Sequence, residues 1–323
     1  MVVASLPDTP VSSEAPRLGG RWTRLVVLAA LIAATAAYVV TADDELAQIQ
    51  RLSLLILLTT SLIQFASQLF WNGSLLLPLK RSAASLGFWE LYLVRSGGVL
   101  VGSLVPVAGG VAVRLAYLRS RGVSYLEFTS ATVLSNLLAL GAAAAVAVVA
   151  TGVLWALTGP PRPAVLGLGV GVLAVSAAAM AAFELVPRLA RQPRAARWPW
   201  IAALSRLQTT SRRLALDVFS LSVVRHVLNF VTFGLLLQAL SGRPNDFLIG
   251  GLVYALSSPI RIVNITPGNL GVTEWVVALV GNVVAFDLGT GLIASLAFRG
   301  VSLVGQGLGV LLGSGWLAAR RRA

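Results

Sequence analysis

The sequence predicts an all-α polytopic membrane protein with about six transmembrane helices and two oppositely oriented, broken helical hairpins, arranged like an inverted repeat. Three observations carry this prediction. Of the 323 residues, 57% are hydrophobic and only 11% are charged, whereas an ordinary soluble domain has about 25% charged residues. Apolar runs of about 20 residues, the length that spans a bilayer, recur along the chain. Two further apolar stretches are interrupted by proline and glycine, which break helices.

The uninterrupted apolar runs define the spans and the domain. The expected spans are residues 25–40, 52–70, 128–157, 164–186, 216–240 and 288–317. Residues 1–20 are polar and rich in proline, serine and glycine, so we expect a disordered tail before a single transmembrane domain at 21–317. Residues 187–213 contain seven arginines and two tryptophans, which predicts an amphipathic segment on the membrane surface. Residues 318–323 form a basic tail.

The two interrupted stretches, at about 86–113 and 247–286, are expected to be re-entrant hairpins. Their helix-breaking residues are Pro106, Gly109 and Gly110 in the first stretch and Pro267, Gly268 and Gly271 in the second. Opposed broken segments in the two halves of a chain are typical of transporters with a site near the bilayer midplane. The alternative is that the glycines only allow helices to pack closely.

The distribution of basic residues predicts the orientation in the membrane. With both termini cytoplasmic, 17 of the 25 basic residues fall in cytoplasmic segments, three in outer turns and five within apolar stretches. Such a bias is the positive-inside pattern of a multi-pass protein of the cytoplasmic membrane. The net charge of +13 therefore indicates contact with an anionic lipid surface rather than with nucleic acid.

Charged residues within the apolar stretches are the candidate ligands, because each costs about 2.5–3.5 kcal/mol to insert. Arg114 and Glu274 each head the helix that resumes after a break, where free N–H groups attract anions. Arginines nearby would add phosphate binding, with Glu274 as a counter-ion or a proton-coupled switch. The alternative is a set of buried ion pairs that fix packing. The candidate substrate-binding residues are Arg114, Arg261, Glu274, Arg299, Arg225 and His226.

Six other polar residues are given structural rather than substrate-binding roles. Glu90 and Arg95 lie near an interface and are expected to extend toward it, as long charged side chains do. Glu127 is expected to cap the start of its span. Asn136, Asn229 and Gln306 are expected to form hydrogen bonds between helices rather than to bind a ligand.

Several classes of chemistry are excluded by the residues present. The chain has no cysteine and a single histidine, so a thiolate site and a multi-histidine metal site are excluded. We find no paired-carboxylate metal motif, no nucleotide-binding loop and no credible catalytic triad. We therefore expect no metal, no cofactor and no enzyme activity, and any transport would run downhill or on an ion gradient.

Both broken stretches carry a family resemblance. The first, PVAGGVAVR at 106–114 followed by a helix and a short basic turn, resembles the first signature of the lysylphosphatidylglycerol synthase transmembrane region, a flippase-like family. The second, PGNLGVTEW at 267–275 followed by an alanine-containing helix with Arg299, resembles its second signature. The resemblance extends over nearly the whole chain, from about residue 21 to 317.

The resemblance implies translocation of an anionic or modified phospholipid, or of a polyprenyl-linked saccharide, between leaflets. Larger relatives carry a soluble aminoacyl-transferase domain, which this sequence is not expected to contain. The alternatives are a membrane-embedded transferase acting on a lipid head group and a non-catalytic scaffold of a cell-envelope complex. The expected partners are a membrane lipid, and a second copy of the chain or a protein of envelope biosynthesis.

Overall fold

Helices form every regular element of the chain that the structure, a computed structural model, describes. The described residues are 49–50, 52–80, 85–104, 109–160, 162–190, 212–262 and 271–322. The helices are α3 (Leu54–Leu79), α4 (Phe88–Leu104), α5 (Gly109–Ser120), α6 (Tyr125–Thr158), α7 (Pro163–Ala190), α9 (Arg212–Ser241), α10 (Asp246–Ser257), the 3₁₀ helix η2 (Ser258–Ile262), α11 (Val272–Val284) and α12 (Leu288–Arg322).

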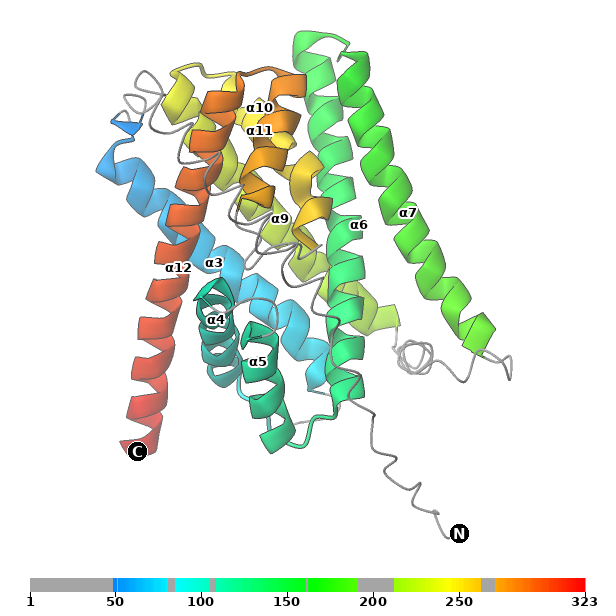
Figure 1. Cartoon of the computed structure of the whole chain (residues 1–323), viewed down its shortest axis with the longest axis vertical. Helices are drawn as coiled ribbons and strands as arrows, with labels where there is room; N and C mark the ends of the chain where they lie inside the picture. Colours follow the sequence, from blue (N-terminus) through cyan, green and yellow to red (C-terminus); the bar gives the residue numbers. More distant parts are fainter. Residues whose placement is uncertain are drawn as a thin grey trace, which may run out of the picture.

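Four of these helices, α3, α6, α9 and α12, are long and apolar enough to cross a membrane. A fifth, α7, is apolar and lies along α6 at the edge of the bundle (Figure 1). These five helices coincide with five predicted spans, which confirms the all-α polytopic fold. The predicted span at 25–40, the tail at 1–20 and most of the segment at 187–213 lie outside the described residues.

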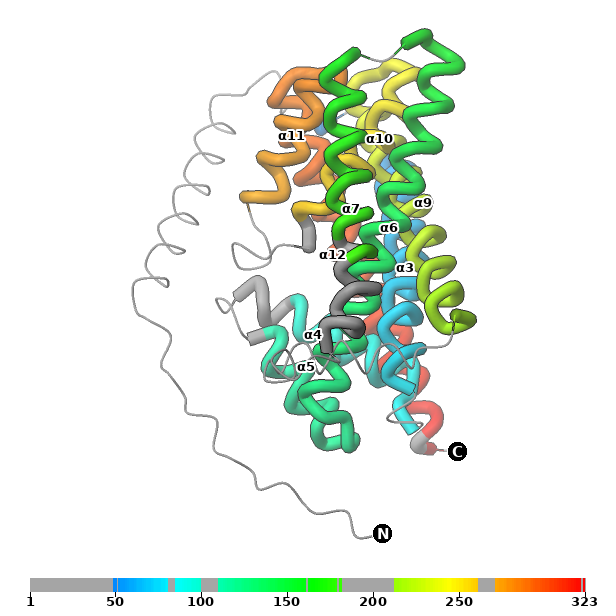
Figure 2. The backbone as a smooth tube through the Cα atoms, turned by 90° about the vertical axis from the view of Figure 1, so that its right-hand side faces the viewer, coloured from blue at the N-terminus to red at the C-terminus, as the bar shows by residue number. Residues whose placement is uncertain are grey.

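The two broken stretches form two helical hairpins in opposite halves of the molecule. Helices α4 and α5 pack together in the lower half, and α10 and α11 pack together in the upper half (Figures 1 and 2). Residues 105–108 connect the helices of the first pair, and residues 263–270 precede α11 in the second. These connections, with Pro106, Pro267 and Gly268, lie outside the described residues.

The first hairpin is held by a close approach of its two helices. A Cβ atom at Gly98 of α4 would lie 2.8 Å from the carbonyl oxygen of Gly110 on α5 and 3.2 Å from Cγ of Arg114. Only glycine therefore allows this spacing. Below the contact, a cluster of buried apolar residues from α3, α4, α5 and α6 fixes the hairpin to the bundle, including Leu79 and Leu118.

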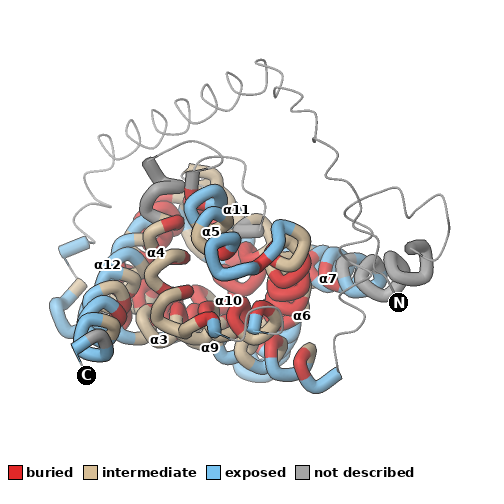
Figure 3. Tube along the Cα trace, turned by 90° about the horizontal axis from the view of Figure 1, so that it is seen from below, coloured by how far each residue is buried: buried red, intermediate tan, exposed pale blue. Residues whose placement is uncertain are grey.

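The second hairpin is attached to the central helix α9. A Cβ atom at Gly250 of α10 would lie 3.1 Å from Cα of Gly234 on α9, so the two backbones pack tightly. Phe233, Tyr254 and Phe298 pack their rings together beside this contact and join α9, α10 and α12. Seen from below, buried residues gather on α6 and α10 at the centre, and exposed residues lie along the outer side of α12 (Figure 3).

Helix α3 has a polar buried face and an apolar exposed face. Its exposed residues near the start include Leu54, Leu55, Leu58 and Leu62. Its buried polar residues are Thr60, Ser61, Gln64, Ser67, Gln68, Asn72 and Ser74. A soluble helix would bury its apolar face instead, so this distribution fits a helix with lipid on one side and a polar protein interior on the other.

The two ends of the bundle differ in their balance of charged residues. The lower end in Figure 1 holds the C-terminal ends of α3, α5 and α12, and the upper end holds the turns α6–α7, α9–α10 and α11–α12. The charged residues at or beside these elements are Lys80, Arg119, Arg121 and Arg320 at the lower end, and Arg162, Arg243, Asp246 and Asp287 at the upper end. Basic residues therefore predominate at the lower end, where Glu90 and Glu127 also lie, and the upper end carries both signs of charge.

Candidate functional site

The centre of the candidate site is Arg95 on α4, which is 1% exposed. Its guanidinium carbon lies 4.0 Å from the ring centroid of Trp71 on α3. The guanidinium carbon of Arg225 on α9 lies 4.3 Å from the same ring. Cation–π contacts of this kind contribute about 2 kcal/mol when they are desolvated. Trp71 therefore brings together two arginines that are 130 positions apart in the sequence.

Arg95 is only partly satisfied by hydrogen bonds. Its Nη2 atom donates to the backbone oxygen of Gln68 (3.3 Å) and to Oε1 of the same residue (2.7 Å). Its Nε and Nη1 atoms are buried without a hydrogen-bond partner among the described residues. The Tyr92 and Ser96 hydroxyls are buried on the same face of α4, within hydrogen-bonding reach of each other. Buried donors without acceptors are costly, so this group of donors is suited to receive an anion.

Arg114, on α5, lies close enough to Arg95 for the two charges to repel each other, as does Arg225. The Arg114 side chain lies against Gly98, and its Nε atom donates to the carbonyl oxygen of Gly110 at 3.0 Å. The structure thus brings two of the predicted residues, Arg114 and Arg225, to the same place. Neither of the two ion pairs among the described residues involves Arg95 or Arg114.

Glu274 and Arg299 form the second part of the candidate site. Glu274 is 2% exposed at the start of α11, and its Oε1 atom accepts from Nε of Arg299 on α12 at 2.5 Å. Its Oε2 atom accepts from the N–H of Gly271 at 2.8 Å, so the carboxylate also caps the helix. Gly271 has a φ of +79°, a conformation that favours glycine. This arrangement matches the alternative interpretation of a buried ion pair.

A polar network on α3 lies between these two parts. Gln64 donates from Nε2 to Oδ1 of Asn229 at 2.8 Å, and Ser67 donates to the same oxygen at 3.0 Å. Ser302, three residues after Arg299, donates to Oε1 of Gln64 at 3.1 Å. Gln64 is one turn from Gln68, which binds Arg95. Polar groups therefore continue from α12 across α3 to the buried arginine, and the expectation for Asn229 is confirmed.

The remaining predicted residues separate from this cluster. His226 is buried and packs toward α10, with its ring centroid 6.1 Å from that of Tyr254. It therefore faces a different neighbour from Arg225, which lies over Trp71. Arg261 belongs to η2, and its side chain lies outside the described residues.

The structural roles predicted for Glu127, Arg95 and Glu90 can be compared with their positions in the structure. The expectation for Glu127 is confirmed, because its carboxylate and the Ser124 hydroxyl form a capping box at the start of α6. The expectation that Arg95 extends toward an interface is wrong, because the residue is buried. Glu90 instead contacts the end of α5 and the turn after it, where it pairs with Arg121 at 3.0 Å and accepts from the Tyr117 hydroxyl at 2.8 Å.

The sequence interpretation missed Trp71 and Gln68, and it misplaced Arg95. The polar spacing of Gln64, Gln68 and Asn72 on α3 was the available signal, because polar side chains at helical intervals inside an apolar run indicate a buried polar face. Among the described residues, no group of three or more histidine, aspartate or glutamate side chains lies close enough to hold a metal ion.

The fold and this site define a multi-pass membrane protein with an arginine-containing polar interior between two opposed hairpins. The chain belongs to the family described as the lysylphosphatidylglycerol synthase TM region, whose family model matches residues 21–309. This confirms the family that the sequence resembles and assigns the chain to membrane proteins that act on lipids. No curated protein and no solved structure matches the chain.

Proposed function

We propose that the protein moves a lipid with a phosphate-containing head group between the two leaflets of the cytoplasmic membrane. The substrate is an anionic or modified phospholipid, or a lipid-linked saccharide. Its head group passes between the two hairpins while its acyl or prenyl chains remain in the bilayer. The protein binds and releases the lipid without changing it covalently.

The observation that carries this proposal is the state of Arg95. A buried guanidinium without an ionised partner is strongly unfavourable unless an anion reaches it. Arg114 and Arg225 lie within electrostatic range and increase the positive potential. Arginine is well suited to phosphate because its donors form a planar fork. A phosphate that enters this cluster would relieve the repulsion between the arginines and accept from the free donors.

The polar face of α3 supports a path for the head group. A phosphate cannot cross hydrocarbon without polar surroundings, and α3 supplies hydroxyl and amide groups over several turns. The arginine cluster lies beside the first hairpin, and the Glu274–Arg299 pair lies beside the second. We propose that the head group moves along α3 between these two places, exchanging one set of polar contacts for the other.

The charges at the two ends of the bundle support the sidedness of the proposal. The lower end, which carries Lys80, Arg119, Arg121 and the last turn of α12, is the cytoplasmic end under the positive-inside rule. The first hairpin then enters from the cytoplasm and the second from the outside, with the C-terminus cytoplasmic.

The test is lipid translocation by the purified chain in liposomes. Fluorescent phosphatidylglycerol is placed in both leaflets, and a membrane-impermeant quencher is added outside. Vesicles with the wild-type protein should lose the signal of both leaflets, whereas protein-free vesicles should lose only about half. Arg95→Gln should slow the second phase at least about tenfold, which corresponds to about 1.4 kcal/mol.

The matched control is Arg121→Gln, which removes an exposed arginine of the cytoplasmic end and should leave the rate within about twofold of wild type. If wild-type vesicles behave like empty ones, the translocation proposal is wrong. If Arg95→Gln, Arg114→Ala and Glu274→Ala all transport at the wild-type rate, the assignment of the site is wrong. Release of a modified head group into solution would instead identify a transferase.

A further inference from the structure

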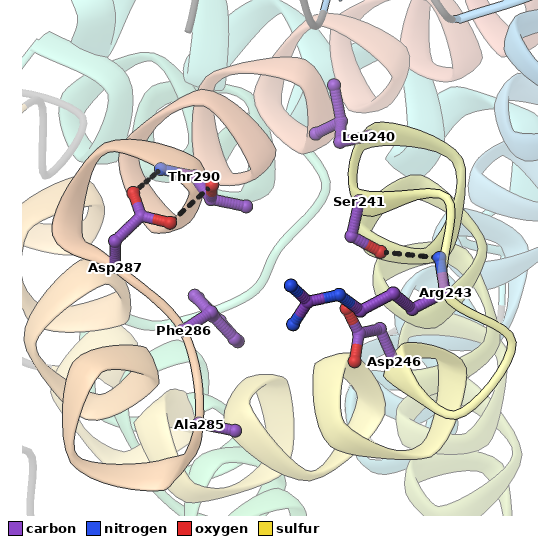
Figure 4. Close-up of a pocket in the computed structure, with 8 residues that line it drawn as sticks. All are labelled: Leu240, Ser241, Arg243, Asp246, Ala285, Phe286, Asp287 and Thr290. Carbon is purple, nitrogen blue, oxygen red and sulfur yellow. Dashed lines mark hydrogen bonds between the residues drawn. The ribbon is translucent and has the colours of Figure 1, made fainter.

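A second polar site lies at the upper end of the bundle, in a pocket of about 310 Å³. It opens between the turn that joins α9 to α10 and the turn that joins α11 to α12 (Figure 4). The lining residues are Leu240, Ser241, Arg243, Asp246, Ala285, Phe286, Asp287 and Thr290. None of the residues predicted from the sequence lines it. Its volume is at the lower limit of small-molecule sites, at about 300 Å³, and suits a single head group rather than a whole lipid.

One of the two carboxylates in the pocket is already used by the protein. Asp287 precedes α12, and its Oδ1 atom accepts from the Thr290 N–H at 2.8 Å. Its Oδ2 atom accepts from the Thr290 hydroxyl, also at 2.8 Å. Both oxygens therefore cap the helix, and Asp287 contributes structure rather than a free charge.

Asp246 and Arg243 are the charges that remain available. Asp246 is only 9% exposed and lines the pocket, and its carboxylate takes part in neither ion pair of the described residues. The Arg243 side chain extends into the pocket beside it (Figure 4). The two residues form no ion pair with each other, since the ion pairs of the described residues are elsewhere. Within the part of the chain that the structure describes, the pocket thus presents one carboxylate and one guanidinium that form no ion pair.

We infer that this pocket binds a zwitterionic group, with an ammonium at Asp246 and a phosphate or carboxylate at Arg243. A group with both charges matches the two free partners at once, whereas a simple anion would face two carboxylates and a simple cation would leave Arg243 without a partner. Phe286 and Leu240 supply an apolar wall for the carbon chain between the charges. This inference concerns binding alone and holds whether or not the protein moves a lipid.

The pocket lies at the end of the second hairpin, where a bound ligand would contact both of its helices. Asp246 begins α10, and Ala285 and Phe286 follow the end of α11, so an occupant contacts both ends of the hairpin. Asp246 also lies in the first turn of α10, where the interaction of a carboxylate with the helix dipole stabilises the helix by about 0.3–1 kcal/mol. If Asp246 only stabilises α10, Asp246→Asn should lower the stability of the protein without weakening ligand binding.

The test is calorimetric titration of the full chain in nanodiscs of phosphatidylglycerol, which contain no zwitterionic lipid. Glycerophosphoethanolamine is the probe, with glycerol phosphate and ethanolamine as ligands that carry one charge each. We expect glycerophosphoethanolamine to bind at least tenfold more tightly than either. Asp246→Asn and Arg243→Gln should each weaken its binding at least tenfold, and Arg162→Gln, at an exposed arginine of the same end, should leave it unchanged.

The outcomes separate binding from folding. Arg243 is exposed, so Arg243→Gln keeps the inference testable even if Asp246→Asn fails to fold. Equal binding of the three ligands, no detectable binding of the probe, or wild-type binding by Arg243→Gln would overturn the inference. A second titration in nanodiscs that contain phosphatidylethanolamine distinguishes the source of the ligand. Weaker binding of the soluble probe there identifies a lipid head group, and unchanged binding identifies a free solute.

Discussion

Glu274 and Arg299 join the first turn of α11 to the middle of α12 through an ion pair in which the carboxylate is buried and the arginine is 26% exposed. The burial is therefore unequal, and the two single variants should differ. Arg299→Ala leaves a buried carboxylate unpaired, which costs about 3–5 kcal/mol. Glu274→Gln leaves a charge that can reach water and should cost less. Thermal unfolding of the purified variants measures both effects.

The double variant Glu274→Gln, Arg299→Ala decides what the pair is for. Its unfolding temperature should recover much of the loss of Arg299→Ala, because no buried charge remains. If the pair only fixes packing, lipid translocation should recover with it. Translocation that stays low in a stable double variant supports a direct role for the charges in the second hairpin.

Replacement of Arg95 by methionine should separate stability from transport. Methionine has a similar length, and it removes a buried charge that has no ionised partner among the described residues, so stability should stay equal or rise by about 1–4 kcal/mol. Lipid translocation should fall at least about tenfold because the phosphate loses its ligand. The midpoint of thermal unfolding measures the effect on stability, and the translocation rate in liposomes measures the effect on transport. A variant that loses stability and transport together would show that Arg95 serves the fold.

The sequence predicted where two of the helices begin or end, because the causes are local. Proline and glycine can end a helix, so the end of α4 before Pro106 and the start of α11 after Gly271 could be expected. The same residue types do not always break a helix, because Pro78 lies inside α3 and Gly97 and Gly98 lie inside α4. Glu127 was predicted as a cap for the same reason, since the capping box extends over three residues. Such features depend on neighbours in the chain rather than on packing.

The arginine cluster could not be predicted in this way. Arg95 meets Gln68 across 27 positions, and Arg225 reaches Trp71 only when α9 packs against α3. Spacing within one helix contains no information about such contacts. The prediction that Arg225 and His226 belong to one site illustrates this limit. Adjacent residues on a helix point about 100° apart and therefore contact different neighbours.

Gly98 should be intolerant of any side chain. A methyl group there would meet the Gly110 carbonyl at 2.8 Å, and overpacking of this kind costs about 1–3 kcal/mol. Gly98→Ala should therefore lower the unfolding temperature and displace Arg114, with slower translocation. Gly97→Ala is the matched control, because a Cβ atom at Gly97 meets nothing within 4 Å. Alanine at that position should be neutral or stabilising, since it favours the helix by about 1 kcal/mol. Equal behaviour of the two variants would contradict the close packing of α4 and α5.

Asp287 should make stability depend on pH through its cap on α12. Partial burial alone would raise the pKa of this carboxyl group, but hydrogen bonds from the N–H and hydroxyl of Thr290 and from nearby backbone N–H groups hold it below its usual range. A lowered pKa in the folded state means that the carboxylate stabilises the fold above the unfolded pKa. This contribution is lost as the pH falls through the folded value.

Asp287→Ala should therefore cost about 0.5–2 kcal/mol at pH 7, which is the usual effect of losing an N-terminal cap. The difference from wild type should shrink as the pH falls below about 4, because the carboxyl group of the unfolded chain becomes protonated there while the folded carboxylate, whose pKa is lower, is still charged. Thermal unfolding of both proteins between pH 3 and pH 7 measures this. Thr290→Val removes one of the two hydrogen bonds and keeps the other, so it should show a smaller difference with the same sign. A gap between wild type and Asp287→Ala that is constant over this range would mean that the cap does not depend on the charge of the carboxylate.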